Sequence, residues 1–556
     1  MARRKHKYIF VVGGVMSGVG KGIATSSLAK ILQGKGFSVN PIKIDPYLNV
    51  DAGTMNPTEH GEVFVLDSGL ETDQDMGNYE RFLDTDLRDD DYMTGGMVYK
   101  SVIDRERSMG YRGKCVESIP HITDEVIRRI HRAADNNGSA ISVIEIGGTV
   151  GEYQNVLFIE AARILKLRHP GDVMFVLVSF LPVPSKVGEM KTKPTQYAVR
   201  TLNSYGVQPD IIFARSDRPI DRKRKEKLAI TCNISADDVI SAPDVESVYD
   251  VPLNFEHDDV GTVVLGKLGL HSPKRTTDLT AWRRFVAQTK RSTPPVKIAI
   301  VGKYFSTGDY VLSDSYISVI EAIKYSAYKE GMTPEITWLD SEDFEKRGAR
   351  ALKSMSHFDG IIIPGGFGGR GIEGKINVIR YAREKQIPYL GLCYGMQLLV
   401  IEFARHVAGI KKAHTAEIEP DAKEPVVDIM ADQKIKLARG NFGGSMRLGV
   451  YPAILKKGTL AYDAYKKTEI SERHRHRFEI NPEFVPRIEA AGLVFSGTSP
   501  NGLLMEIAEL PRKDHPFFVG TQFHPEFKAR PLSPHPLFTS FIKACINKGG
   551  AKKTTK

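Results

Sequence analysis

Hydrophobic residues in the first half of the chain are concentrated in short, β-branched runs, each followed by a turn and a helical pattern. The five clearest runs cover residues 7–14, 37–45, 139–148, 172–183 and 209–217. Strands that are apolar on both faces and alternate with helices are typical of a parallel sheet covered by helices on both sides. The pattern therefore predicts a doubly wound α/β domain.

A second series of the same kind begins after a change in character near residue 271. The intervening segment is polar and basic, contains a short helical stretch around Trp282, and ends at Pro294-Pro295, which is typical of a linker. Four further apolar runs follow, at residues 296–304, 334–340, 358–368 and 387–395. We predict an α/β domain over 1–270, a linker over 271–295, a second doubly wound, mainly parallel α/β domain over 296–548, and a disordered basic tail over 549–556.

The bulk composition narrows the class of protein. The chain has 556 residues, 41% of them apolar, and no apolar run of about 20 residues that would indicate a membrane span. Its four cysteines show no paired spacing, so we expect no disulfide framework and a cytoplasmic location. The net charge of +10 would favour the binding of phosphorylated small molecules. Because no basic motif is interleaved with aromatic residues, we do not expect a nucleic-acid partner.

A glycine-rich segment, GGVMSGVGKG at residues 13–22, lies between the first predicted strand and the first predicted helix. It departs from the strict phosphate-loop pattern at Val15, where a glycine is usual, and at Gly22, where a hydroxyl residue usually binds Mg²⁺. Backbone N–H groups at a helix N-terminus, together with Lys21, still favour an anion site over a purely structural turn.

The missing hydroxyl requires the metal ligands to come from elsewhere in the chain. Carboxylates are the ligands that Mg²⁺ prefers. Glu145 lies at the end of an apolar run beside a second glycine turn, and Asp75 lies in the acidic segment GLETDQDMG. We predict that these two residues form the metal pair.

The second half contains a cysteine between a predicted strand and a predicted helix. In PYLGLCYGMQ, Gly391 and Gly395 flank Cys393, as in a nucleophile elbow, where close packing of strand and helix needs small residues. The following helix N-terminus favours a thiolate. The alternative for this segment alone is a buried, inert cysteine.

Two further segments supply what a cysteine nucleophile needs. In TQFHPEF, His524 and Glu526 are expected on one side of a strand, as a base and the carboxylate that orients it. The glycine loop at residues 361–371 offers backbone N–H groups for an oxyanion hole. Together with the cysteine segment, these features resemble the class I glutamine amidotransferase family across the whole second half.

This resemblance implies that Cys393 is the nucleophile, His524 the base and Glu526 the orienting group. The positions that match the glutamine-binding residues of the family are Gly366, Tyr394, Gly395, Met396, Gln397, Glu417 and Arg475.

Four long segments of the first half, residues 43–82, 143–152, 188–196 and 214–219, resemble the CTP synthase family, and the glutaminase half fits the same family. The resemblance runs from about Tyr8 to the region of Cys545. It implies that ATP phosphorylates O4 of UTP and that ammonia from glutamine displaces the phosphate to give CTP.

The same resemblance implies sites for the two nucleotides. Lys21 and Lys43 would stabilise the transferring phosphoryl group, which is mainly a matter of positioning and electrostatics. The ATP-binding positions are Gly18, Val19, Gly20, Lys21, Gly22, Ile23, Asp75, Pro243, Asp244 and Val245. The UTP- and CTP-binding positions are Ser17, Glu152, Tyr153, Gln154, Lys191, Thr192, Lys193, Pro194, Thr195, Gln196 and Lys227.

Regulation and assembly are implied only by the resemblance. The family is activated by GTP, to which Arg370 is expected to respond, is inhibited by CTP, and forms a homotetramer; filament formation is left open. Four residues depart from the pattern of many relatives at positions expected to affect feedback and GTP coupling: Glu152, Gln154, Thr231 and Arg112.

Two other functions would share part of these sequence features. An amidotransferase of the cobyric acid synthase kind would share the deviant phosphate loop and the glutaminase, but would not need the lysine-rich segment near residue 191. A nucleotide-dependent switch or partitioning protein has similar phosphate loops, but it has no use for a glutaminase half.

Overall fold

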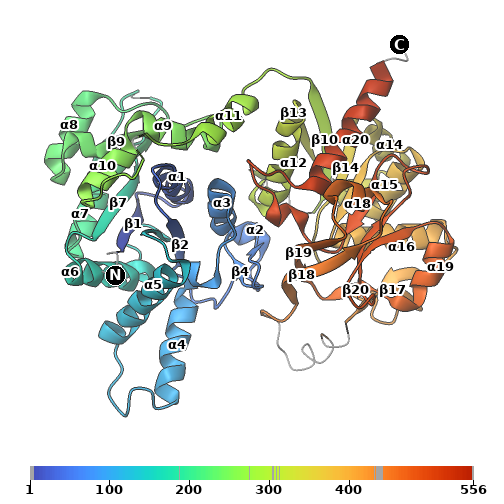
Figure 1. Cartoon of the computed structure of the whole chain (residues 1–556), viewed down its shortest axis with the longest axis horizontal. Coiled ribbons are helices and arrows are strands. Elements are labelled where there is room, and N and C mark those ends of the chain that lie inside the picture. Colours follow the sequence, from blue (N-terminus) through green and yellow to red (C-terminus); the bar gives the residue numbers. More distant parts are fainter. Residues whose placement is uncertain are drawn as a thin grey trace. The chain divides into compact units, whose positions relative to one another are not determined.

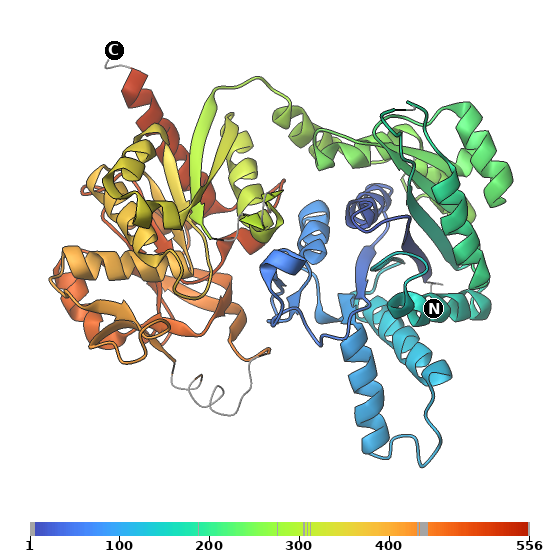
Figure 2. The same cartoon turned by 180° about the vertical axis from the view of Figure 1, so that it is seen from behind.

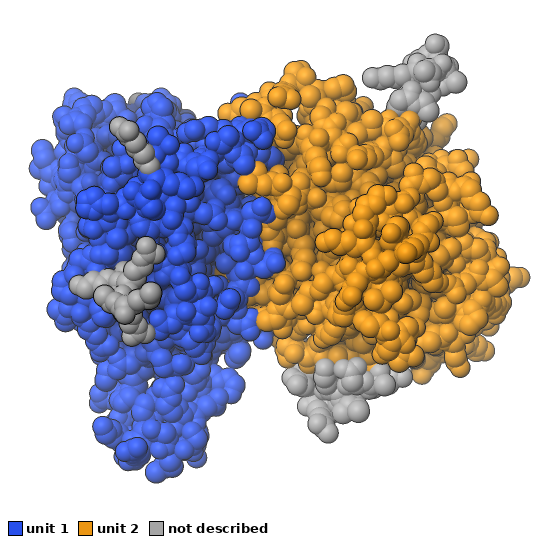
Figure 3. All heavy atoms as spheres, viewed as in Figure 1, with its two compact units in different colours: residues 1–51, 78–286 blue, residues 52–77, 287–556 orange. Residues whose placement is uncertain are grey.

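The computed structural model describes residues 6–186, 188–274, 276–303, 306–307, 310–311, 313–430, 433 and 443–553 (Figure 1). The chain divides into two compact units (Figure 3). Unit 1 contains residues 1–51 and 78–286, and unit 2 contains residues 52–77 and 287–556. The predicted boundary at residue 270 therefore differs from this division at two places, residues 52–77 and the region of Trp282.

Unit 1 is built on a seven-stranded sheet in the order β5-β2-β6-β1-β7-β8-β9. Every pairing within it is parallel, as expected from the apolar runs. The strands are β1 (Lys7–Gly14), β2 (Val39–Asp45), β5 (Tyr92–Thr94), β6 (Ile141–Ile146), β7 (Val173–Phe180), β8 (Ile211–Ser216) and β9 (Val239–Pro243). The helices are α1 (Lys21–Gly34), α4 (Gly95–Arg107), α5 (Thr123–Asn137), α6 (Val156–Arg168), α7 (Lys193–Ser204), α8 (Arg222–Cys232), α9 (Val251–His257), α10 (Val260–Lys267) and α11 (Thr280–Thr289).

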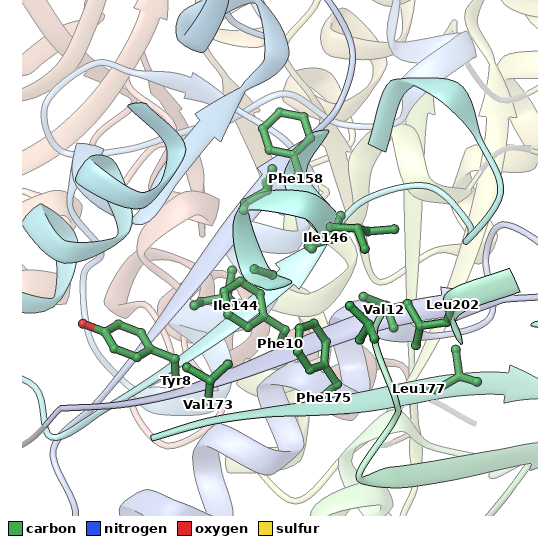
Figure 4. Close-up of a cluster of buried hydrophobic side chains, with 14 of the residues drawn as sticks. Tyr8, Phe10, Val12, Ile144, Ile146, Phe158, Val173, Phe175, Leu177 and Leu202 are labelled. Carbon is green, nitrogen blue, oxygen red and sulfur yellow. The ribbon is translucent and has the colours of Figure 1, made fainter. Parts of the chain in front are cut away.

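The core of unit 1 follows from the alternation of side chains along the central strand β1. Tyr8, Phe10 and Val12 point to one face and pack in a cluster with Phe158 of α6 and Leu202 of α7 (Figure 4). The intervening residues of β1 are also fully buried, because successive side chains point to opposite faces and both faces are covered. The doubly wound fold predicted for this half is confirmed.

The segment around Trp282 is part of unit 1. Trp282 is buried in α11, its indole Nε1 donates to the Tyr249 carbonyl at 2.9 Å, and its ring packs against Phe82 at 4.9 Å. An amphipathic helix that buries an indole gains more by packing than by remaining in solvent. The predicted linker therefore begins with a helix that is packed on the first unit.

Unit 2 is built on a nine-stranded mixed sheet in the order β13-β10-β14-β15-β23-β22-β21-β18-β19 (Figure 2). The pairs from β13 to β23 are parallel and those from β23 to β19 are antiparallel. The strands are β10 (Pro295–Gly302), β13 (Thr333–Asp340), β14 (Gly360–Ile363), β15 (Tyr389–Leu392), β18 (Arg447–Leu455), β19 (Glu469–His476), β21 (Val494–Thr498), β22 (Met505–Glu509) and β23 (Phe518–Thr521). The α/β class is confirmed, with a more strongly mixed sheet than the apolar runs indicated.

The helices of unit 2 include α12 (Ile317–Lys329), α13 (Ser341–Lys346), α14 (Gly348–Ser354), α15 (Ile372–Glu384), α16 (Tyr394–His406), α18 (Leu460–Tyr465), α19 (Val485–Ala490) and α20 (Pro536–Lys553). A small sheet is formed by β16 (Ala413–Thr415), β17 (Glu424–Ile429) and β20 (Phe478–Ile480). Helix α20 continues into the tail predicted to be disordered from residue 549. No helix in the described part of the chain is both long and apolar enough to cross a membrane.

Residues 52–77 come from the first half of the sequence but pack in unit 2. They form the short helix α2 (Pro57–His60) and an antiparallel pair of two-residue strands, β3 (Phe64–Val65) and β4 (Glu71–Thr72). The Asp67 carboxylate accepts from Nε of the fully buried Arg473 on β19 at 2.5 Å. Phe64 packs edge-on against Phe527 at 5.1 Å. Helix α3 (Gln74–Leu83) then carries the chain into unit 1.

Candidate functional site

Cys393 lies at a sharp turn between β15 and α16. Its backbone has φ 50° and ψ −101°, an unusual conformation for a residue other than glycine. A Cβ added to Gly395 would lie 2.2 Å from the Ile363 carbonyl oxygen, and one added to Gly391 would lie 2.7 Å from the Gly395 backbone. The flanking glycines are therefore required by the close approach of strand and helix, as the sequence predicted for a nucleophile elbow.

His524 and Glu526 form the expected pair beside this elbow. Nδ1 of His524 lies 2.7 Å from Oε1 of Glu526, and both side chains are buried. Burial alone would lower the pKa of His524, but the Glu526 carboxylate and the Cys393 side chain together raise that pKa to about 10. The site therefore favours an imidazolium between a carboxylate and the cysteine.

One local prediction for this pair is wrong. Strand β23 ends at Thr521, and residues 525–528 form a 3₁₀ turn, so His524 and Glu526 do not share a strand. Pro525 has no N–H to donate to a strand ladder, which explains why the strand does not continue. The turn, not a strand face, brings the imidazole and the carboxylate together.

The sulfur atom of Cys393 has two further polar neighbours. Sγ lies 3.7 Å from the carbonyl oxygen of Arg475 and 3.7 Å from the side-chain Nε2 of Gln522. Gln522 is completely buried, and its Oε1 accepts from Nε2 of Gln397 at 3.2 Å. The Gln397 side chain is thus engaged inside the protein, so its expected contact with glutamine would have to use its backbone.

A cavity of about 410 Å³ opens beside the triad within unit 2. Its walls include Cys393, His524 and Gly366, which are predicted catalytic and glutamine-binding positions, and Phe367, which was not predicted. Segment 52–77 forms another wall, through Gly53, Thr54, Met55, Glu62 and Val63. The size suits a ligand as small as an amino acid.

Arg475 lies in the wall of this cavity, where the sequence placed the partner of a substrate carboxylate. In the structure its Nε donates to Oε1 of Glu71 at 2.8 Å, and its guanidinium lies 5.4 Å from the centre of the Phe367 ring. Glu71 is 1% exposed, so this is a sheltered ion pair. A carboxylate ligand would share Arg475 with Glu71 or displace it.

The glycine loop after β14 is held by charged side chains. The Gly368 N–H donates to Oε1 of Glu417 at 2.7 Å, and Nζ of Lys303 donates to the Gly368 carbonyl at 3.0 Å. Burial raises the pKa of Glu417, against the effects of the Gly368 N–H and of Lys303. Arg370 is paired with Glu342 at 3.0 Å and also donates to the Lys303 carbonyl.

A buried polar cluster lies next to the triad on β18, β19, β20 and β22. Arg447 donates to Glu479 at 3.0 Å and to Glu506 at 2.7 Å, and His474 contacts His476 at 3.0 Å. Burial and the neighbouring Glu506 raise the pKa of Glu479 to about 8, although Arg447 opposes this rise. Burial lowers the pKa of both histidines well below the usual value.

In unit 1, the predicted phosphate loop connects β1 to α1. Gly18 and Gly20 have φ of 69° and 89°, and Lys21 begins the helix. Nζ of Lys21 donates to the Gly148 carbonyl at 2.8 Å, which brings the two glycine turns together. The N-terminus of a 14-residue helix, next to a lysine, is a suitable anion site.

Five of the ten predicted ATP positions line one cavity of about 340 Å³ in this unit. They are Gly20, Ile23, Pro243, Asp244 and Val245, the last three at the carboxyl end of β9. Ligands of doubly wound sheets bind at the carboxyl ends of the strands, where this cavity lies. Asp244 pairs with Arg215 at 2.8 Å.

The predicted UTP and CTP positions divide into two groups. Thr192, Thr195 and Gln196 are buried, and their side chains bond within the fold. The other eight are all exposed or partly exposed, including Tyr153 at 96%. Those residues are Ser17, Glu152, Tyr153, Gln154, Lys191, Lys193, Pro194 and Lys227. Only the second group offers side chains to a ligand directly.

Lys43 and Glu145 lie together at the carboxyl ends of β2 and β6. Nζ of Lys43 is 3.0 Å from Oε1 of Glu145 and 3.5 Å from Oδ1 of Asp45, and Tyr79 donates to Oε2 of Glu145 at 2.5 Å. Carboxylate oxygens here fit Mg²⁺, which usually takes one or two protein carboxylates and completes its shell with phosphates and water. No set of three or more His, Cys, Asp or Glu ligands assembles among the described residues. Asp75 belongs to the other unit, so its pairing with Glu145 remains a prediction.

Comparison with known proteins gives consistent results over both halves. Residues 7–270 match a family model described as CTP synthase N-terminus, and residues 311–544 match one described as class-I glutamine amidotransferase. The CTP synthase of Pyrococcus abyssi (strain GE5 / Orsay) is 50% identical over 540 residues, which cover 97% of each chain. The CTP synthase of Caldanaerobacter subterraneus is 48% identical over 542 residues, 97% of this chain and 98% of the relative.

The chain belongs to the CTP synthase family. A solved structure, the glutaminase domain of Trypanosoma brucei CTPS with bound acivicin, is 34% identical and covers 45% of this chain and 94% of that chain, with a TM-score of 0.41. The expected activity, glutamine-dependent amination of UTP to CTP by a ligase, is confirmed at the level of the family.

Within the CTP synthase fold, four positions were expected to alter regulation, and all four are described. Thr231 is exposed on α8 and donates to the Lys227 carbonyl at 2.7 Å. Glu152 accepts from Gln154 at 2.8 Å and from the Thr149 N–H at 2.8 Å. Arg112 is exposed in a turn after α4 with φ 54°. Their effect on feedback and on GTP remains a prediction.

Sequence reasoning missed two contributions to the glutaminase site of this CTP synthase. Gln522 contacts the sulfur of Cys393, and residues 53–55, 62 and 63 line the cavity. The position of Gln522, two residues before His524, was a usable signal because alternate residues of an extended segment share a side. Nothing local in these five residues indicated that they would pack in a unit whose remaining sequence begins at Ala287.

Proposed function

We propose that Cys393, His524 and Glu526 release ammonia from glutamine for the amination of UTP. The Cys393 thiolate attacks the amide carbon of glutamine, and the His524 imidazolium gives its proton to the leaving ammonia. The neutral imidazole then takes a proton from a water molecule, which attacks the thioester and releases glutamate. Glu526 holds the imidazole in position throughout.

The glutamine substrate would occupy the 410 Å³ cavity beside this triad. Gly366 and the backbone of Tyr394, Gly395, Met396 and Gln397 would contact the reacting end. Glu417 would receive the amino group of glutamine and Arg475 its carboxylate. The position of Arg475 in the cavity wall, already paired with Glu71 at 2.8 Å, supports its role in binding a carboxylate.

The nucleotide half would activate UTP by phosphorylation at O4, because phosphate is a better leaving group than a carbonyl oxygen. ATP would bind at the glycine loop, with its base in the cavity lined by Ile23 and residues 243–245. Lys21 and Lys43 would neutralise charge on the transferring phosphoryl group. Glu145 and Asp75 would hold Mg²⁺, which neutralises phosphate charge and orients the triphosphate when bound.

Regulation and assembly complete the proposal. GTP would activate glutamine hydrolysis with Arg370 responding, and CTP would inhibit through the pyrimidine-nucleotide positions. The exposure of Tyr153, Lys191 and Lys227 is consistent with a pyrimidine site completed by a neighbouring subunit of a homotetramer. We also propose a cytoplasmic enzyme without a nucleic-acid partner.

The observation that carries this proposal is the Cys393–His524–Glu526 arrangement in a chain that matches CTP synthases over 97% of its length. The test is CTP formation by wild type and Cys393→Ala with glutamine or with ammonium chloride. We expect the variant to lose glutamine-dependent synthesis and to keep ammonia-dependent synthesis. Loss of both activities in a folded variant would refute the division of labour.

A further inference from the structure

The sulfur of Cys393 lies between two groups of opposite hydrogen-bonding character. The Arg475 carbonyl oxygen can only accept, and the Gln522 amide nitrogen can only donate; each is 3.7 Å from Sγ. A thiol can donate its proton to the carbonyl. A thiolate has no proton to donate, so it is repelled by the carbonyl oxygen and needs the donor on the other side.

The orientation of the Gln522 amide is fixed by a chain of hydrogen bonds. The Phe478 carbonyl only accepts, so the Gln397 amide must present Nε2 to it, at 3.0 Å. The same Nε2 donates to Oε1 of Gln522 at 3.2 Å. With its oxygen engaged in this way, Gln522 presents its N–H to Cys393. Both glutamine side chains are at most 2% exposed, so water does not compete with these bonds.

The geometry points to Gln522 as a further catalytic side chain of the glutaminase site, which stabilises the Cys393 thiolate by donating an N–H to Sγ. The inference rests on the proposed role of Cys393. The bond strengthens whenever negative charge resides on sulfur. That occurs before Sγ attacks the amide carbon, and again when water adds to the thioester and the C–S bond breaks with its electron pair on sulfur.

This role separates Gln522 from the other groups around the nucleophile. His524 exchanges protons with the substrate, whereas the amide of Gln522 keeps its protons and supplies only a fixed dipole. The side chain of Gln397 contacts no reacting atom and positions Gln522. Removing the Gln522 donor should therefore change how the ionisation of the Cys393 sulfur depends on pH. Removing a residue needed only for packing would not.

The test is Gln522→Met, which keeps the length and volume of the side chain and removes the donor. The rate of alkylation of Cys393 by iodoacetamide is followed from pH 5 to 10 on the peptide that carries Cys393. We expect the alkylation profile to move about one pH unit upward, so that the rate at a pH on its rising limb falls about tenfold. Glutamine-dependent kcat/KM is expected to fall about 10- to 100-fold, with ammonia-dependent synthesis unchanged.

Two further variants complete the experiment. Gln397→Met leaves Gln522 in place but frees its amide to rotate, so we expect a smaller shift in the same direction. Gln208→Met removes a glutamine of unit 1 whose amide nitrogen donates to backbone carbonyls, including that of Cys232 at 2.8 Å, and should leave the profile of Cys393 unchanged.

An unchanged alkylation profile in Gln522→Met would overturn the inference, whether or not glutamine use falls. If Gln522→Met does not fold, as judged by lost ammonia-dependent synthesis, Gln397→Met decides by the same criterion. Alkylation requires neither glutamine nor nucleotides. A failure of the proposed function, seen as glutamine-dependent synthesis by Cys393→Ala, is therefore distinguishable from a failure of this inference.

Discussion

The pKa values of individual charged residues in unit 2 depend on burial as much as on their partners. His524 has a raised pKa because a carboxylate and a cysteine outweigh the cost of burial, whereas nearby His474 and His476 have lowered pKa values because no carboxylate compensates enough for them. The Arg447 guanidinium is shared by two buried carboxyl groups, those of Glu479 and Glu506. Burial therefore keeps a proton on this pair of carboxyl groups above neutral pH.

This cluster predicts a specific dependence of stability on pH. The pKa of Glu479 is about 8 in the folded protein, against 4.5 as the ordinary value. A raised pKa means that the folded state binds the proton more tightly, so its stabilising effect is lost as pH rises from 4.5 through 8. The limit is about 1.4 kcal/mol per pH unit.

We expect Glu479→Gln, which keeps the oxygen that accepts from Arg447, to gain stability relative to wild type as pH rises from 5 to 8 and to level off above. Chemical denaturation at each pH measures the difference. Glu483→Gln on the surface is the control, with a constant difference. A constant difference for Glu479→Gln as well would contradict the raised pKa.

At the scale of elements, the elbow between β15 and α16 depends on backbone contact without an intervening side chain. Gly395 meets the Ile363 carbonyl of β14, and Tyr389 donates to the Gly395 carbonyl at 2.9 Å. The neighbouring backbone atoms cannot move away without displacing β14 or α16.

We therefore expect Gly395→Ala to destabilise unit 2 by about 1–3 kcal/mol and to reduce glutamine-dependent CTP synthesis, with ammonia-dependent synthesis retained. Thermal unfolding and the two assays measure this. Gly266→Ala in α10 is the matched control, because a Cβ there meets nothing within 4 Å and alanine favours a helix. Equal stability of both variants would show that the elbow can relax.

The sequence predicted correctly those elements that depend on residues close together in the chain. The sharp turn at Cys393, the glycine turn between β1 and α1 and the parallel core of unit 1 depend on neighbouring residues, and each lies where the sequence predicted it. Phosphate binding by the glycine turn remains a prediction. The strand expected at His524 was wrong, since β23 ends at Thr521 and Pro525 begins a 3₁₀ turn. The position of residues 52–77 in unit 2 depends on contacts such as Asp67 with Arg473, which no short window of sequence contains.

At the scale of the whole molecule, one segment from the first half of the sequence, residues 52–77, is part of unit 2. Segment 52–77 is fixed in unit 2 by the Asp67–Arg473 and Glu71–Arg475 ion pairs and by Glu62, which accepts from the Ser318 N–H at 3.2 Å. Arg473 is completely buried, and Asp67 supplies it with a compensating charge.

Asp67→Asn should accordingly cost about 1–3 kcal/mol, because it removes one carboxylate from the buried Arg473 guanidinium and one link between segment 52–77 and β19. Hydrogen exchange should show loss of protection in residues 52–77 before the rest of unit 2, and thermal unfolding gives the total cost. Asp463→Asn removes an exposed ion pair with Arg512 and should cost less than about 1 kcal/mol. Similar values for both variants would mean that Arg473 finds compensation elsewhere.

The location of segment 52–77 also limits how this enzyme can be divided or recombined. A glutaminase fragment that begins at Ala287 would lack the cavity wall formed by Gly53, Thr54 and Met55. A chimera that takes its glutaminase from a relative would need residues 52–77 from the same relative, although they lie within the other half of the gene. The synthetase and glutaminase halves therefore have to be exchanged together. A fusion point chosen at Ala287 would separate the cavity beside Cys393 from part of its own wall.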